Sequence, residues 1–149
     1  MKTLILGILS LFWLTGCQSD NDATTAEKFG KPFQLGIQQE ALIAGQPPAE
    51  SLNVVVESIT DSRCPEGAQC IWAGNAEVSL SLSDGADTQP LTLCLGDCRS
   101  GENPGFIEQD TTSVTVGGQM YEVILKAVVP YPSINGSTGN QEAVLEINP

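Results

Sequence analysis

Cysteine is the residue type in this chain with the most chemical potential. Four of the five cysteines form two close groups, Cys64 with Cys70 and Cys94 with Cys98. Four thiolates would suffice for a tetrahedral zinc site, but five and three residues separate the cysteines within each group. Two disulfides are the alternative, and three pairings are possible. We favour Cys64–Cys70 and Cys94–Cys98, because each bond would close a short loop that holds proline or glycine.

The chain contains no histidine. This excludes Ser-His-Asp and Cys-His catalysis and removes the commonest ligand of catalytic metals. Cysteines paired in disulfides cannot serve as nucleophiles. The 18 acidic residues leave a hydrolase with two carboxylates as an alternative, but no pair of acids is marked by its context. We therefore predict that the protein is not an enzyme and that it has no cofactor.

Two acidic segments offer oxygen ligands of the kind that calcium prefers. They are Asp84-Gly85-Ala86-Asp87, and Gly96-Asp97 together with Glu102-Asn103. Neither has the spacing of a defined calcium loop. Aspartate and glycine also favour turns for reasons of backbone geometry alone. The sequence therefore predicts turns at these positions and no metal site.

The fifth cysteine, Cys17, follows a short apolar segment. Leu4–Leu14 is roughly eleven residues long, whereas a permanent membrane helix needs about twenty. With Lys2 before it, the segment is typical of a signal peptide. Leu14-Thr15-Gly16-Cys17 resembles the lipobox that the signal peptidase of bacterial lipoproteins reads. The resemblance implies cleavage before Cys17 and a diacylglycerol on its thiol; an ordinary secretory signal is the alternative.

The lipobox resemblance also implies a location. Lipoproteins of this class carry three acyl chains in many bacteria, palmitate among them, and two or more chains anchor a protein stably. Gln18 and Ser19 follow the cysteine, and no aspartate stands at position 18. By resemblance to the enterobacterial sorting rule, this favours the outer membrane over the inner one. The cell envelope is an oxidising compartment, which favours disulfides over thiolates.

The remaining composition indicates one exported domain. We expect a leader over residues 1–16, a flexible polar tether with the lipidated cysteine over 17–31, and a folded domain over 32–149. Loss of the leader would leave 5 basic and 18 acidic residues and a net charge of −13. Such a charge repels nucleic acid and provides no polybasic patch for anionic lipid. The membrane is therefore expected as a partner only through the N-terminal lipid.

Alternating apolar and polar residues predict β-strands along the whole domain. The strictest alternation is at Asn75–Ser83, and Gly117-Gly118 between two β-branched runs predicts a two-residue hairpin. About seven strands without a helix predict an all-β fold, either an antiparallel β-sandwich or a small barrel. A long loop is expected over 96–109. In the strand at 120–129, one face is expected to present Tyr121, Val123, Leu125, Ala127 and Val129. The other expected strands lie at 33–37, 52–59, 91–95, 114–116 and 143–147.

One segment stands out, Asp61–Gly74, with the sequence DSRCPEGAQCIWAG. Its DSRCP start, second cysteine and WAG end resemble a family of small exported bacterial proteins, many of them lipoproteins. The apolar strand before the segment and residues 124–132 after it also resemble that family. The resemblance covers most of the domain from about Phe33, although only the Cys-Trp segment is specific. It implies a shape and no activity.

This segment has two interpretations. In the first, the disulfide stiffens the loop, Trp72 plugs the end of the core, and Asp61 and Arg63 brace the loop through hydrogen bonds. In the second, the stiff loop presents Arg63 and Trp72 to another envelope protein, with Asp61 fixing the arginine, as in an inhibitor or adaptor. The sequence thus predicts a non-enzymatic binding or structural role, with Asp61, Arg63 and Trp72 as candidate binding residues.

Overall fold

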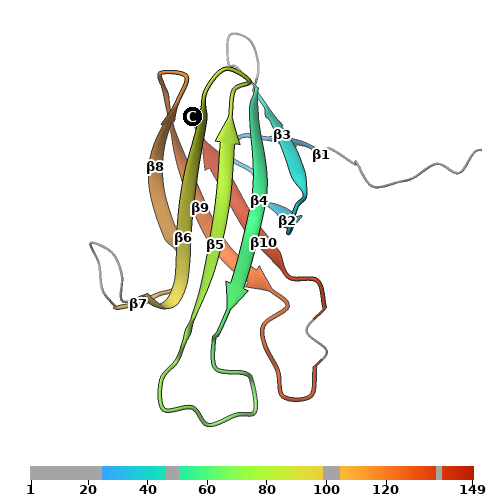
Figure 1. Ribbon diagram of the computed structural model, residues 1–149, viewed down its shortest axis with the longest axis vertical. Helices are drawn as coiled ribbons and strands as arrows, with labels where there is room; N and C mark the ends of the chain where they lie inside the picture. Colours follow the sequence, from blue (N-terminus) through green and yellow to red (C-terminus); the bar gives the residue numbers. More distant parts are fainter. Residues whose placement is uncertain (1–24, 46–50, 99–104, 137–138) are drawn as a thin grey trace, which may run out of the picture.

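Two β-sheets packed face to face make up the domain (Figure 1). The computed structural model describes residues 25–45, 51–98, 105–136 and 139–149. Within these ranges every regular element is a strand. The strands are β1 (Thr25–Lys28), β2 (Phe33–Gly36), β3 (Glu40–Ala44), β4 (Leu52–Asp61), β5 (Asn75–Ser83), β6 (Thr88–Cys98), β7 (Gly105–Ile107), β8 (Asp110–Val116), β9 (Gln119–Val129) and β10 (Glu142–Asn148).

The first sheet has the strand order β1-β3-β4-β5-β6-β7, and the second has the order β2-β10-β9-β8. All neighbours are antiparallel except β1 and β3, which run parallel. The two sheets do not close into a barrel. The predicted all-β fold is therefore confirmed as a sandwich, with more strands than the sequence indicated.

The core lies between the sheets because each long strand alternates between an apolar and a polar face. In β5 the apolar set is completely enclosed, whereas the serines and Glu77 point outward. The opposite sheet contributes Tyr121, whose ring stacks on Phe29 with the ring centroids 5.8 Å apart. The largest enclosed side chains are Tyr121, Leu35, Ile43, Leu52, Leu80, Leu82, Leu93, Leu125, Leu145 and Ile147.

A β-bulge in β9 corrects one prediction. Val144 of β10 pairs with Ala127, but the next residue, Leu145, pairs with Leu125, so Lys126 is an extra residue in β9. An extra residue reverses the inward and outward alternation beyond it. Val128 is consequently buried, whereas the predicted inward residues after Leu125, Ala127 and Val129, are only partly buried. A second bulge, in β4 between Val56 and Ser58, also reverses the inward and outward alternation, so that Ile59 is buried.

The sequence pattern did not predict β1, β3 or β7, and the strand predicted at 91–95 is longer in the structure, where β6 covers Thr88–Cys98. β1 falls inside the predicted tether, because its residues are mostly exposed and give no apolar alternation. β6 runs on through Cys98, and β7 pairs with its end, so the expected loop over 96–109 is partly strand. Ile37 is exposed rather than buried because β2 ends at Gly36 and the chain then turns.

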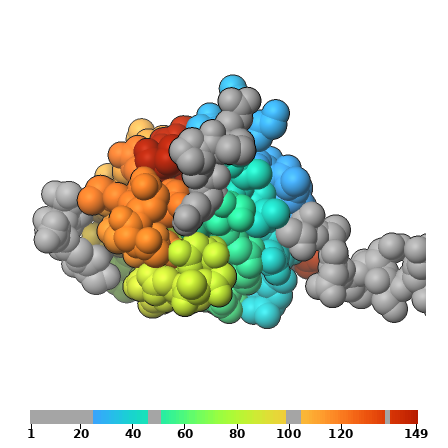
Figure 2. Space-filling model, turned by 90° about the horizontal axis from the view of Figure 1, so that it is seen from above, coloured from blue at the N-terminus to red at the C-terminus, as the bar shows by residue number. Residues whose placement is uncertain are grey.

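The end of the sandwich opposite the Cys64–Cys70 disulfide is closed by two turns. Gly117 and Gly118 both have positive φ, 58° and 86°, as the predicted two-residue hairpin requires. The amide of Gly117 donates a hydrogen bond of 3.1 Å to the Asp87 carboxylate in the β5–β6 turn. Figure 2 shows the two turns packed against each other in orange and yellow-green.

The predicted leader, Cys17 and the first part of the tether lie outside the described residues. In the part of the chain that the structure describes, no helix is long and apolar enough to cross a membrane.

The buried face of β5 provides a test of the fold. Leu80 is 1% exposed at the centre of the first sheet, and Leu42 on β3 is 38% exposed. We expect Leu80→Ala to lower the free energy of unfolding by about 2–5 kcal/mol, because it leaves a cavity in the core. The matched Leu42→Ala should cost less than about 1 kcal/mol. Urea unfolding measures both, and equal losses would contradict the placement of the core.

Candidate functional site

The β4–β5 loop, residues 62–74, extends beyond the ends of both sheets (Figure 1). Its base continues the β4–β5 ladder, since the Ser62 amide donates to the Asn75 carbonyl at 2.8 Å and the Cys64 amide to the Ala73 carbonyl at 2.7 Å. Gly74 closes this base with φ at 71°. A Cβ atom there would lie 2.0 Å from the Ser62 carbonyl oxygen, so only glycine fits.

Both predicted disulfides are confirmed. Cys64–Cys70 lies within the β4–β5 loop, and Cys94–Cys98 lies at the end of β6. The free energy gained from closing such short loops is about 2 kcal/mol each in the chain-entropy model. The first disulfide therefore restricts the loop that projects from the sandwich.

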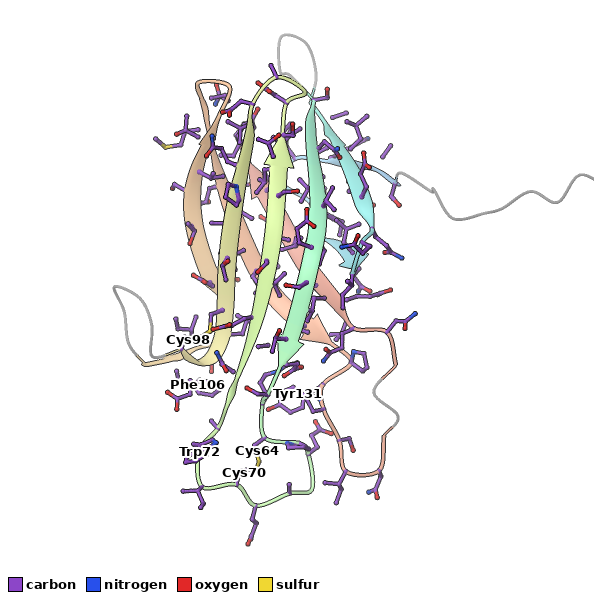
Figure 3. All side chains as sticks on the ribbon, in the orientation of Figure 1. Cys64, Cys70, Trp72, Cys98, Phe106 and Tyr131 are labelled. Atoms are coloured by element: carbon purple, nitrogen blue, oxygen red, sulfur yellow. A yellow bond between two sulfur atoms is a disulfide. The ribbon has the colours of Figure 1, made fainter. Side chains whose placement is uncertain are left out.

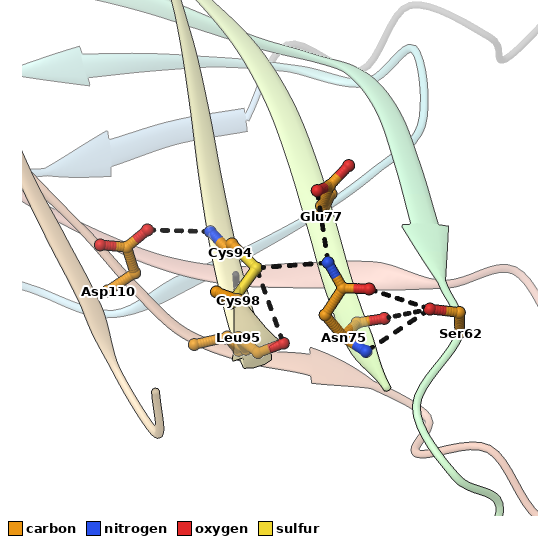
Figure 4. The surroundings of a disulfide bond; sticks show 7 residues. All are labelled: Ser62, Asn75, Glu77, Cys94, Leu95, Cys98 and Asp110. Carbon is orange, nitrogen blue, oxygen red and sulfur yellow. Dashed lines mark hydrogen bonds between the residues drawn. A yellow bond between two sulfur atoms is a disulfide. The ribbon is translucent and has the colours of Figure 1, made fainter. Parts of the chain in front are cut away.

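The Cys94–Cys98 disulfide fixes a sharp bend in β6. Four residues of extended strand would span about 13 Å, but the Cα atoms of the two cysteines are 6.1 Å apart. Gly96, with φ at 94°, allows this bend. Figure 4 shows that the amide of Cys94 donates to the Asp110 carboxylate at 2.8 Å, which connects β6 to β8. At the bend, the Asp97 amide donates to the Gly74 carbonyl at 2.8 Å, which links the end of β6 to the base of the β4–β5 loop.

Asp61 and Arg63 form a buried ion pair at the base of the loop. Arg63 Nε donates to Asp61 Oδ1 at 2.9 Å, and Arg63 Nη2 contacts Asp61 Oδ2. Only 10% of the Arg63 side chain and 1% of the Asp61 side chain are exposed. Asp61 Oδ2 also accepts a hydrogen bond of 2.8 Å from Gln141 Nε2. The paired charges are thus satisfied inside the protein.

The same arginine joins the loop to the second sheet. Arg63 Nη2 donates to the Val128 carbonyl at 2.8 Å, and its guanidinium lies 4.3 Å from the centre of the Tyr131 ring. Further along, the amide of Glu66 donates to the Pro132 carbonyl at 2.8 Å. The structure therefore places Asp61 and Arg63 in the bracing role of the first interpretation and leaves Arg63 little surface for a partner.

Trp72 is on the surface, where the second interpretation needs it. Its side chain is 68% exposed at the loop (Figure 3), so it doesn't plug the core. The neighbouring Ile71 is 96% exposed. Ile71 was not among the predicted binding residues, although an isoleucine between a disulfide cysteine and a tryptophan in a short loop has no strand in which to be buried. The structure thus separates Trp72 from the Asp61–Arg63 pair.

Other large apolar side chains are exposed at the same end of the sandwich. Phe106 comes from β7, and the β9–β10 loop contributes two more; Figure 3 labels Trp72, Phe106 and Tyr131 at this end. A patch of this kind marks a contact site more often than scattered surface residues do. We call it the loop-end surface, and it consists of Ile71, Trp72, Phe106, Tyr131 and Ile134.

Two hollows lie at this end of the sandwich. One, the aromatic pocket, has a volume of about 200 Å³ and is lined by residues that include Arg63, Ala73, Phe106, Glu108, Lys126 and Tyr131. The other, the tryptophan hollow, has a volume of about 320 Å³ and is lined by Ser62, Trp72, Gly74, Asn75 and Asp97. Each hollow has a single carboxylate in its lining, so neither supports the two facing acids that the hydrolase alternative requires.

The acidic turn at Asp84 is explained by backbone chemistry. Asp84 Oδ1 accepts hydrogen bonds from the amides of Ala86 at 2.9 Å and Asp87 at 2.7 Å. These bonds, with that of Asp87 the stronger cause, lower the pKa of Asp84. Among the described residues, no three cysteine or acidic side chains are arranged to hold a metal ion. The other candidate calcium segment includes Glu102 and Asn103, which lie outside the described residues.

Comparison with protein-family models, with curated proteins and with solved structures finds no match for this chain.

Changes at the buried Asp61–Arg63 pair should lower the free energy of unfolding far more than a change at the exposed Trp72. We expect Arg63→Met to lower the free energy of unfolding by about 3–5 kcal/mol, because it leaves a buried carboxylate without its cation. The double variant Asp61→Asn/Arg63→Met should lose less than the sum of its two single changes. Trp72→Ser should stay within about 0.5 kcal/mol of the parent protein.

Urea unfolding under non-reducing conditions measures all four variants. Additive single and double changes would contradict the coupling between the two side chains. A loss of several kcal/mol in Trp72→Ser would place Trp72 in the core after all.

Proposed function

We propose that this protein is a lipid-anchored protein of the bacterial cell envelope that binds another envelope protein through its loop-end surface. It acts without catalysis. The proposal rests on one observation above all, namely that Ile71 and Trp72 are exposed on a loop that is fixed at its base and closed by a disulfide.

Conformational entropy and exposed apolar area both favour binding through this loop. A loop that is ordered before it binds loses less conformational freedom when it docks. Tryptophan is among the side chains that most often dominate binding energy, since it buries a large area with few rotatable bonds. Exposing isoleucine and tryptophan to water has a free-energy cost that contact with a partner would recover. Arg63 has a different role, because it holds the loop in place.

The shape of the loop favours an inhibitor or adaptor over a purely structural part. A structural role does not require Ile71 and Trp72 to be exposed. A protruding loop that is closed by a disulfide can enter a cleft of a partner and bury both side chains there. Trp72 would be the centre of the contact, with Ile71 beside it. The loop-end surface would supply the surrounding apolar area.

The proposed location rests on the sequence. The apolar run, the Leu-Thr-Gly-Cys end and the polar residues after it support cleavage before Cys17 and acylation of its thiol. Two disulfides among the other four cysteines agree with an oxidising compartment. Gln18 after the acylated cysteine favours the outer membrane.

Lipid attachment is tested on the native protein. We expect mass spectrometry of the mature protein to find an N-terminal Cys17 with acyl chains, and we expect Triton X-114 to extract it into the detergent phase. Cys17→Ser should abolish both, because the thiol is the point of attachment. Retention of residues 1–16, or an unchanged detergent partition of Cys17→Ser, would contradict the proposal.

Site-specific photo-crosslinking tests the contact. We expect benzoylphenylalanine at position 71 to give a discrete crosslinked protein in the producing organism's envelope, and Trp72→Ser in the same chain to remove it. Position 120 is the matched control, because Met120 is 61% exposed in the β8–β9 hairpin at the opposite end. Identical products from positions 71 and 120, or none from position 71, would refute the contact.

A further inference from the structure

Among the described residues, the exposed charged groups beside the loop-end surface are acidic. Glu66 lies in the disulfide loop, and Glu108 lines the aromatic pocket; both side chains are exposed. Asp97 lines the tryptophan hollow. Carboxylates therefore lie next to each part of the apolar area.

The two described cations near this surface are neutralised within the protein. Arg63 pairs with Asp61. Lys126 Nζ lies 3.1 Å from Glu146 Oε2. Each cation is only partly accessible, and each is matched by its own carboxylate. These residues therefore do not cancel the acidic character of Glu66 and Glu108.

The other described lysines lie at the far end of the sandwich. Lys28 pairs with Ala44 at the end of β3, next to the start of β4. Lys31 follows Gly30, whose amide donates to the Ile147 carbonyl near the end of β10. The whole chain has a formal net charge of −12. Its field attracts cations over long range, and the loop end offers them apolar area together with carboxylates.

We propose that the partner presents a cationic segment to the loop-end surface, in which one apolar side chain is flanked by lysine or arginine. This inference rests on the proposed function and specifies its partner. The apolar side chain enters the aromatic pocket between Phe106 and Tyr131, while the basic side chains pair with Glu66 and Glu108. A second copy of this chain is a poor partner, because two strongly acidic surfaces repel each other.

The size of the aromatic pocket agrees with this occupant. Pockets for drug-sized molecules measure about 300–1,000 Å³, and this one measures about 200 Å³. A single apolar side chain is the matching size. Ala73 lines this pocket, and Trp72, the preceding residue, lines the tryptophan hollow. A segment that extends from one hollow to the other would therefore contact Trp72.

Selection from a phage-displayed library of random dodecapeptides tests the inference. The bait is the mature chain, residues 17–149, with Cys17→Ser, and the same chain with Trp72→Ser serves for negative selection. We expect the selected peptides to carry lysine or arginine on both sides of an aromatic residue or leucine. Their affinity, measured by calorimetry, should fall at least about tenfold in Trp72→Ser and remain unchanged in Met120→Ser.

Removal of the Glu66 and Glu108 charges measures the electrostatic contribution to peptide binding. Glu66→Gln/Glu108→Gln should weaken binding of the selected peptides about three- to tenfold and reduce its sensitivity to salt. The matched control Glu27→Gln/Glu40→Gln removes the same two charges on β1 and β3 and should have no such effect. Equal effects of the two pairs would overturn the inference, because the charge would then act only through the whole molecule.

Failure of the cationic segment can be told apart from failure of the proposed protein contact. Trp72-dependent peptides that are neutral or acidic, or Trp72-dependent binding to neutral oligosaccharides on a glycan array, would overturn the cationic segment. Trp72-dependent neutral or acidic peptides would leave the proposed protein contact intact. Failure of the photo-crosslink at position 71 would overturn that contact itself, and the inference with it.

Discussion

The Asp61–Arg63 ion pair connects the parts of the loop end. It joins the end of β4 to the end of β9 through the Val128 carbonyl, and to the β9–β10 loop through the Tyr131 ring and Gln141. A buried pair of this kind contributes little net stability by itself, but removal of one partner is costly. Its effect is therefore to fix one arrangement of two loops that belong to different sheets. The placement of the exposed side chains on these two loops depends on that arrangement.

The division of roles within one short segment follows from side-chain chemistry. Arginine has a planar group with several donors, so it can satisfy a carboxylate and a backbone carbonyl while it stacks on a ring. Tryptophan two residues beyond the disulfide has no such network and lies in water. Close backbone packing adds to the rigidity, since Cβ atoms at Gly74 and Gly96 would lie 2.0 Å and 2.6 Å from carbonyl oxygens. The loop is thus stiff where it is buried, and its exposed part presents Ile71 and Trp72.

The sequence predicted what depends on local pattern and missed what depends on pairing. Alternation located β5 and the ends of the Gly117-Gly118 hairpin, and short loops located both disulfides. The bulge at Lys126 has no local signal, because it arises from the register between β9 and β10. β1 was missed for a similar reason, since its residues gain order from β3 rather than from burial. In the site, the residue types of Arg63 and Trp72 did not reveal that one is buried and the other exposed.

Strand β1 sets a limit on how far the protein can reach. Thr25 is eight residues beyond Cys17, and eight residues extend at most about 26–29 Å. Thr25 pairs with Ala41, which pairs with Val54, seven residues before the end of β4 at Asp61. Those seven residues add about 23 Å. With acyl chains on Cys17, the end of β4, at the base of the loop that carries Trp72, would lie within roughly 50 Å of the lipid surface, which would confine any encounter at this loop to a layer close to the bilayer.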